Sequence, residues 1–342
     1  MESKSKGNAI FDYTKFILSI MIIALHTKFL PNILNPWLRL AVPMFFVISS
    51  YFFFSKIGKS SSSSEKNKIF IHYVKRNMQL YLFWFVLLLP IIVYIRRWFL
   101  NGIVLGALKM IRDFIFSSTF TASWYIMASI IATFLIYILS QKLSNEKILC
   151  IATLVYVMVC FFSGYRFLAD KSNFLNIVME QYIKLFTLPA NSFPVALFWV
   201  TCGKCFADGT FDKIFIKLNN KVGVVFCAVL FYFEWWIVRR ITNESSKDCY
   251  FMLIFLVPCI FQLLKGINII ATSKTIFLRK LSTVTYVLHG SAIHVLRKIL
   301  RIINFEYNGL LLIIVFTCCL MATFLIMILE KKKLFKWLKY AY

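Results

Sequence analysis

Long apolar stretches restrict what this chain can fold into more than any other feature of its sequence. Several of them approach or exceed the roughly 20 apolar residues that are needed to span a bilayer as a helix. Sixty per cent of the 342 residues are hydrophobic and 15% are charged, whereas a soluble domain is about half apolar and a quarter charged. The sequence therefore predicts an all-α polytopic membrane protein.

About ten transmembrane helices can be placed, all in one membrane domain that covers residues 1–342. Two mixed segments, 97–121 and 167–190, are expected to be amphipathic or re-entrant. The Ser-rich stretch GKSSSSSEKNK has no apolar period and is expected to be a soluble loop. The predicted spans are approximately 9–29, 37–56, 72–95, 122–141, 147–166, 191–207, 221–240, 249–266, 282–300 and 308–330.

The basic residues predict how these spans are oriented. The net charge is +25, but the Lys and Arg residues lie in clusters between apolar segments, which favours contact with anionic lipid head groups over nucleic acid. With the N-terminus inside, the inner segments hold 23 of them and the outer segments 15; these 38 and Lys15 account for all 39. We therefore expect both termini in the cytoplasm (N-in/C-in).

Polar residues share one face of the first predicted span, KFILSIMIIALH and its flanks. Eleven residues of an α-helix return to within about 20° of the starting direction and rise about 16 Å. Lys15 and His26 therefore lie on the same face, close to Asp12 and Ser19. Ionisable groups at such depth usually face the protein interior and mark function. Taken singly, Lys15 is also explained as an interfacial lysine paired with Asp12, and His26 as a polar group near the outer interface.

The segment FDYTKFILSIMIIALH resembles the opening helix of the acyltransferase-3 family of integral membrane acyltransferases, in which an acidic residue, a basic residue and a histidine occur with this spacing. A second stretch, RLAVPMFFVISSYFFF, is similar to the Pro-x-Phe-Phe-x-x-Ser-Gly-Tyr signature of the second helix and includes Ser49. It departs from that signature at Ser50, where Gly is usual. We expect the extra hydroxymethyl group to loosen a close helix contact there.

Three further segments resemble family motifs in the same order along the chain. SWYIMASIIATFLIYIL resembles the segment that opens the fourth helix with Trp124 and Tyr125, FWVTCGKCF a short Phe…Gly helix, and LSTVTYVLHGSAIHVL a Tyr-x-x-His segment. The resemblance thus covers essentially the whole chain, although only the first two motifs are specific.

The resemblance implies an acyltransferase of the bacterial cytoplasmic membrane and the cell envelope. It would move an acyl group, most simply acetyl, from cytoplasmic acyl-CoA to a hydroxyl of an extracytoplasmic or lipid-linked glycan such as a polysaccharide. His26 would be a general base or a transient acyl carrier, and Lys15 would meet the anionic donor or fix the electrostatics of the site. No bound cofactor and no metal are expected, because the nine cysteines and four histidines lack zinc-site spacing. Because the sequence ends twelve residues after Glu330, we expect no soluble catalytic domain in this chain.

Other residues are weaker candidates. Glu234, inside the seventh span, is predicted to orient or charge-balance a histidine or to hold an acceptor hydroxyl, with a pair to Arg239 or Arg240 as the alternative. Arg39 binds an anionic acceptor or anchors a helix at the head groups. Further candidates for substrate contact are Asp12, Ser49, Trp124 and Tyr125, although Trp and Tyr at a helix start also fit an interfacial belt.

Two other functions remain open at this point. One is a transporter or flippase of an anionic substrate, in which the polar stripe is a binding track. The other is an acyltransferase that acts on a lipid or another small acceptor. Dependence on acyl-CoA distinguishes the enzyme from the transporter.

Overall fold

The computed structural model of the chain describes residues 8–215, 220–242, 248–302 and 308–342. These residues form helices and no strand; an isolated bridge joins Asn8 to Ile270. The helices, in chain order, are α1 (Ile10–Thr27), η1 (Asn35–Leu40), α2 (Ala41–Gly58), α3 (Ser63–Leu87), α4 (Leu89–Arg96), η2 (Trp98–Asn101), α5 (Ile103–Ile115), α6 (Ser123–Leu139), α7 (Asn145–Phe162), α8 (Arg166–Ala169), α9 (Asn173–Phe186), α10 (Phe193–Ala207), α11 (Thr210–Phe215), α12 (Asn220–Thr242), α13 (Leu253–Lys265), α14 (Ser273–Ile302), α15 (Asn308–Leu329) and η3 (Lys333–Ala341).

A helix lies at each of the ten predicted spans, but these helices differ in length and polarity. Within the described residues, five are long and apolar enough to cross a membrane, and six if a bent pair counts as one span. Three others, α6, α10 and α13, are apolar but have only 13 to 17 residues. The fold is therefore that of an all-helical integral membrane protein. The ten-span count and the N-in/C-in orientation remain predictions, and residues 1–7 of the tail assigned to the inner side lie outside the described residues.

The predicted span 72–95 is not one straight helix. α3 ends at Leu87, α4 begins at Leu89, and the two meet at an angle of 75°. Pro90 occupies the first turn of α4. Proline has no N–H and its ring clashes with the carbonyl group four residues earlier, which ends a helix just before it.

The predicted Ser-rich loop is shorter than expected, because α3 already begins at Ser63. The Ser62 hydroxyl accepts a hydrogen bond from the N–H of Glu65 at 3.1 Å, and the Glu65 carboxylate accepts one from Ser60 at 2.7 Å. A serine followed three residues later by glutamate is a capping signature that starts a helix. The apolar period used to place the span could not detect this polar first turn.

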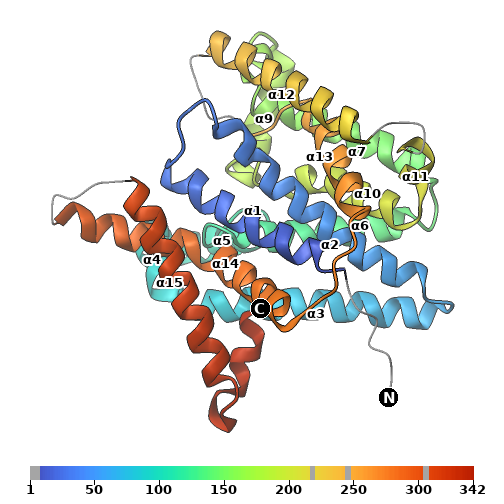
Figure 1. Ribbon diagram of the computed structural model, residues 1–342. Helices are drawn as coiled ribbons and strands as arrows, with labels where there is room; N and C mark the ends of the chain where they lie inside the picture. Colours follow the sequence, from blue (N-terminus) through green and yellow to red (C-terminus); the bar gives the residue numbers. More distant parts are fainter. Residues whose placement is uncertain (1–7, 216–219, 243–247, 303–307) are drawn as a thin grey trace, which may run out of the picture.

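The middle of the molecule is formed by α1 and α2, with α14 and α15 to one side and α12 and α13 to the other (Figure 1). α1 packs on α14, and α2 packs on α10. Gly203 of α10 lies against Ser50 of α2, where an added Cβ would collide with the Ser50 hydroxyl and lie 2.6 Å from the Val47 carbonyl oxygen. The expectation that Ser50 loosens a helix contact is therefore wrong, because Gly203 on the facing helix accommodates the hydroxymethyl group.

Candidate functional site

The polar face of α1 begins with an ion pair to α14. Asp12, 5% exposed, accepts two hydrogen bonds from Arg279, at 2.8 Å from Nε and 2.7 Å from Nη2. These hydrogen bonds raise the pKa of Arg279, which precedes the predicted span 282–300, and keep it charged. The alternative in which Asp12 pairs with Lys15 is not realised. Ser19 is fully buried and its hydroxyl donates to the Phe16 carbonyl oxygen.

Lys15 has no hydrogen-bonding or ion-pair partner among the described residues. Its Nζ lies 5.8 Å from the centroid of the Phe52 ring on α2, and Asp12, Arg279 and Arg76 act on it electrostatically. A half-buried ammonium group without a hydrogen-bonding partner costs free energy. Such a group is available for an anionic ligand.

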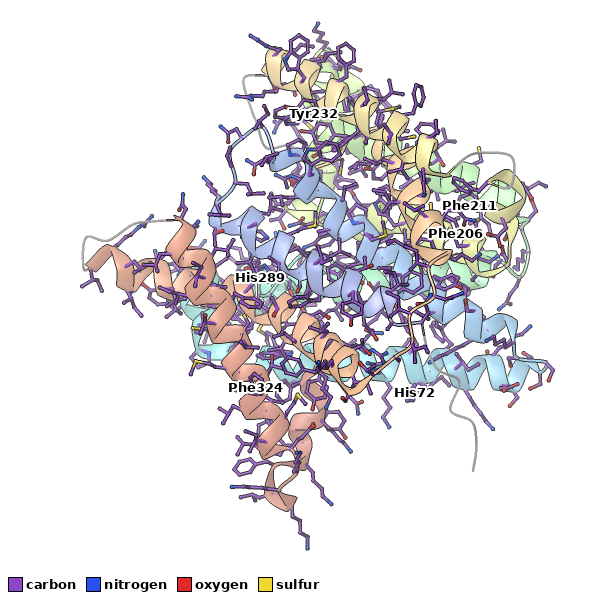
Figure 2. The ribbon with its side chains drawn as sticks, viewed as in Figure 1. His72, Phe206, Phe211, Tyr232, His289 and Phe324 are labelled. Atoms are coloured by element: carbon purple, nitrogen blue, oxygen red, sulfur yellow. The ribbon has the colours of Figure 1, made fainter. Side chains whose placement is uncertain are left out.

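His26, in the last turn of α1, faces a second histidine. The ring centroids of His26 and His289 lie 5.1 Å apart with 31° between the planes. His289, on α14, is 1% exposed; its Nδ1 lies 2.7 Å from the Tyr286 carbonyl oxygen, and its Nε2 has no hydrogen-bonding partner among the described residues. Figure 2 shows His289 in the interior, whereas His72 lies away from it on α3. Because Nδ1 can only donate to a carbonyl oxygen, Nε2 carries the lone pair.

Family-like motifs of three helices, α2, α6 and α14, meet in one row of rings beside this pair. Tyr125 of α6 contacts Phe46 of α2, with ring centroids 4.4 Å apart, and Tyr286 of α14 at 5.1 Å. Tyr286 lies 5.3 Å from Phe45 and 6.1 Å from His289. Tyr125 therefore contacts residues of the second motif and of the last one, and Tyr286 connects this row to His289.

Trp124 and Ser49 each contact a residue of this row of rings. Trp124, 8% exposed, packs on Phe46 with 5.9 Å between the ring centroids. Ser49 lies near the hydroxyls of Tyr73 and Tyr125. Both residues thus border the row without touching the histidine pair.

Arg39 reaches the histidine site together with an acidic partner. It forms an ion pair with Asp248, which precedes α13; Arg39 is 12% exposed and Asp248 49%. Both side chains act electrostatically on His26. The charge of Arg39 is therefore compensated within the protein, which sequence reasoning could not foresee.

His26 is one of the residues that line an open cleft of about 1050 Å³. The end of α4 contributes Tyr94 and Arg97, and α14 contributes a row of basic residues. Gly290 also lines it, and an added Cβ there would collide with the side chain of Thr121, another lining residue. The basic residues of α14 in this lining are His294, Arg297, Lys298 and Arg301.

Glu234, on α12, has a different setting from the one predicted. Its carboxylate accepts hydrogen bonds from the Tyr165 hydroxyl and from the N–H groups of Phe251, at 2.7 Å, and Met252, at 2.9 Å. These N–H groups lie at the N-terminus of α13, a position that favours a carboxylate. Glu234 thus joins three segments and makes none of the predicted contacts with a histidine or with the arginines that follow it on α12, each of which lies over a tryptophan ring.

The sequence analysis missed the partner of His26 and the basic cleft. His289 lay in a recognised Tyr-x-x-His segment, but its distance from His26 is set by how α1 and α14 pack. The cleft did leave a signal, because His294, Arg297, Lys298 and Arg301 follow the i, i+3, i+4, i+7 spacing of one helix face. Among the described residues, no cluster of three or more His, Cys, Asp or Glu side chains is arranged to hold a metal ion.

The fold and this site define an integral membrane protein with two adjacent histidines, of which His289 is buried in the helical bundle and His26 is exposed at the cleft. The sequence model of the acyltransferase-3 family, described as "Acyltransferase domain", matches residues 8–330. The chain therefore belongs to this family of membrane acyltransferases, as its motifs predicted.

Two curated proteins of Enterococcus faecalis, both named "Amino-acid racemase", are similar to the chain. One is 25% identical over 344 residues, which cover 96% of this chain and 47% of that protein. The other is 24% identical over 273 residues, or 77% of this chain and 36% of that protein. A "Serine/alanine racemase" of Enterococcus gallinarum is 24% identical over 166 residues, 45% of this chain and 22% of its own length. The chain thus spans less than half the length of these relatives. No solved structure matches it.

Proposed function

We propose that the chain transfers an acyl group, most simply acetyl from cytoplasmic acyl-CoA, to a hydroxyl of an extracytoplasmic or lipid-linked glycan. The observation that carries the proposal is the His26–His289 pair, in which His26 lines an open cleft and His289 lies buried behind it. Imidazole is the side chain best suited to exchange a proton near neutral pH. Membership of the acyltransferase-3 family supports acyl transfer as the reaction.

The reaction needs one proton acceptor at the acceptor hydroxyl. As a general base, His26 takes the hydroxyl proton while the oxygen attacks the thioester carbonyl carbon; the carbon–sulfur bond breaks, and the thiolate leaves as the thiol after protonation. As an acyl carrier, His26 attacks the thioester itself and passes the acyl group on. The unpartnered Nε2 of His289 supports either route, because it can accept a hydrogen bond from His26 and so fix the orientation of the ring.

The two ends of α1 suit two different substrates. Lys15 has no anionic partner with which it is hydrogen-bonded, and it lies on the side that the orientation prediction assigns to the cytoplasm, where acyl-CoA is available. His26 lies about 16 Å further along the helix axis and borders the open cleft. The donor would thus enter at Lys15 and the acceptor at the cleft. The racemase names of the relatives describe proteins of which this chain covers less than half, and we propose no racemase activity from them.

The test is label transfer from radiolabelled acetyl-CoA to candidate glycans by the purified chain. We expect His26→Ala to lower the transfer rate about 10²- to 10⁴-fold, the usual contribution of a positioned acid–base group. His72→Ala is the matched control, since His72 is exposed and lies on α3. Equal transfer by the parent and by folded His26→Ala would assign His26 a structural role. If neither consumes acetyl-CoA, another acyl donor or the transporter function takes precedence.

A further inference from the structure

The cleft beside His26 is lined by positive charge. Arg97 comes from the residue after α4, and Arg297, Lys298 and Arg301 come from the last two turns of α14. None of the described residues that line the cleft carries a carboxylate. In a concave site, several charges of one sign add up and attract a ligand of the opposite sign.

Hydrogen bonds hold part of this lining in place. Lys298 donates to the Tyr94 hydroxyl at 2.8 Å, and its Nζ lies 4.6 Å from the centroid of that ring. Arg297 donates to the carbonyl oxygen of His26 at 2.9 Å. Each of these partners is neutral, so the contacts position the two cations without cancelling their charge. Arg97 is exposed, and no hydrogen bond or ion pair ties its side chain to the described residues.

The carboxylate that acts on His26, that of Asp248, already has a cationic partner. Asp248 acts on His26 electrostatically, but it is paired with Arg39. The charges of Arg97, Arg297 and Lys298, none of which is paired with a carboxylate of the described residues, therefore remain for a ligand. A doubly or multiply charged oxyanion fits it best, because guanidinium and ammonium groups form short charge-assisted hydrogen bonds to phosphate oxygens.

We propose that this cleft binds the phosphate or diphosphate of the acyl acceptor, so that the acceptor is a phosphate-bearing molecule such as a diphosphate-linked sugar. The inference rests on the proposed function, which places the donor at the Lys15 end of α1 and leaves the cleft at the His26 end for the acceptor. Anchoring by the phosphate would hold a hydroxyl of the attached sugar beside the histidine pair. A neutral glycan would bring no negative charge to Arg97, Arg297 and Lys298.

The experiment measures binding and needs no turnover. The full chain, in nanodiscs of neutral phosphatidylcholine, is dialysed against radiolabelled inorganic pyrophosphate. We expect the double variant Arg97→Gln/Lys298→Gln to bind pyrophosphate at least about tenfold more weakly, because two charge-assisted contacts are lost. The charge-preserving variant Arg97→Lys/Lys298→Arg should bind within about threefold of the parent, which shows that a loss in the first variant reflects charge. Lys274→Gln, an exposed cation at the other end of α14, is the matched control and should not change binding.

Two further measurements distinguish an acceptor phosphate from the phosphates of coenzyme A and of phospholipid. Coenzyme A should bind the double variant as it binds the parent, and phosphatidylglycerol in the discs should not displace pyrophosphate. The proposal is overturned if the parent does not bind pyrophosphate or if the double variant binds it equally well. It is also overturned if coenzyme A binding falls in parallel, which would make the cleft a donor site, or if phosphatidylglycerol competes, which would make it a phospholipid site. None of these results bears on whether acyl transfer requires His26, which the label-transfer assay decides separately.

Discussion

Glu234 and His289 are both ionisable groups within predicted spans, yet their surroundings are opposite. The Glu234 carboxylate accepts three hydrogen bonds, from one tyrosine hydroxyl and two N–H groups. His289 is 1% exposed, and its Nε2 has no hydrogen-bonding partner among the described residues. The sequence does not show this difference, because it does not reveal which atoms of other segments reach each side chain.

The hydrogen bonding of a buried ionisable group distinguishes groups that stabilise the fold from groups that can bind a ligand. A fully hydrogen-bonded polar group inside a protein stabilises one arrangement of the chain, whereas an unpaired one costs free energy until a substrate or water meets it. By this criterion, Glu234 fixes α12 to the start of α13. His289, together with His26 and Lys15, belongs to the site that we propose a substrate completes.

The largest effect on stability is expected for Glu234→Ala. This change leaves the Tyr165 hydroxyl and the two N–H groups of α13 without their acceptor and should cost about 3 kcal/mol. Thermal unfolding in detergent measures the loss, and the transfer rate per folded molecule should stay within about threefold. Glu234→Gln, which keeps one acceptor oxygen, should lose less stability. A hundredfold slower transfer in a stable Glu234→Gln variant would break the comparison and support the catalytic role that the sequence suggested.

A smaller effect, on activity alone, is expected at His289. Asn places its amide near the position of Nδ1 and Gln places its own near Nε2, so the two substitutions separate the two ring nitrogens. We expect His289→Asn to lower kcat about 30-fold, close to 2 kcal/mol, with KM little changed, and His289→Gln to lose clearly less. Equal losses in both variants, accompanied by a lower Tm, would show that His289 only fills space.

The smallest effect is expected at the contact between α2 and α10. Gly203→Ala inserts a methyl group against Ser50 and the Val47 carbonyl and should destabilise the fold by about 1.5 kcal/mol. Ser50→Gly, which restores the residue usual in the family motif, should recover part of that loss in the double variant. A double-mutant cycle in thermal unfolding measures the coupling. Additive losses would show that the two residues do not share one space.

The sequence predicted the composition of the site better than its arrangement. Asp12, Lys15 and His26 could be assigned to one face because helical geometry fixes residues eleven positions apart. Tyr125 and Tyr286 could be recognised only as parts of motifs, since their contact depends on how α6 and α14 pack. The partners of Asp12 and Arg39, which are Arg279 and Asp248, lie more than 200 residues away, beyond the reach of any periodic pattern.

By itself, the sequence determined that this chain is an all-helical membrane protein of the acyltransferase-3 family, because apolar length and short motifs are local properties. The bend at Pro90 and the helix start at Ser63 are also determined by neighbouring residues, a proline and a capping serine. The apolar pattern alone did not reveal them. Only the tertiary structure decided which ionisable groups are satisfied and which are free. The hydrogen bonding of a buried group depends on atoms from distant segments, which reach it only when the helices have packed. Packing therefore bonds Glu234 to the start of α13 and places His289 beside His26.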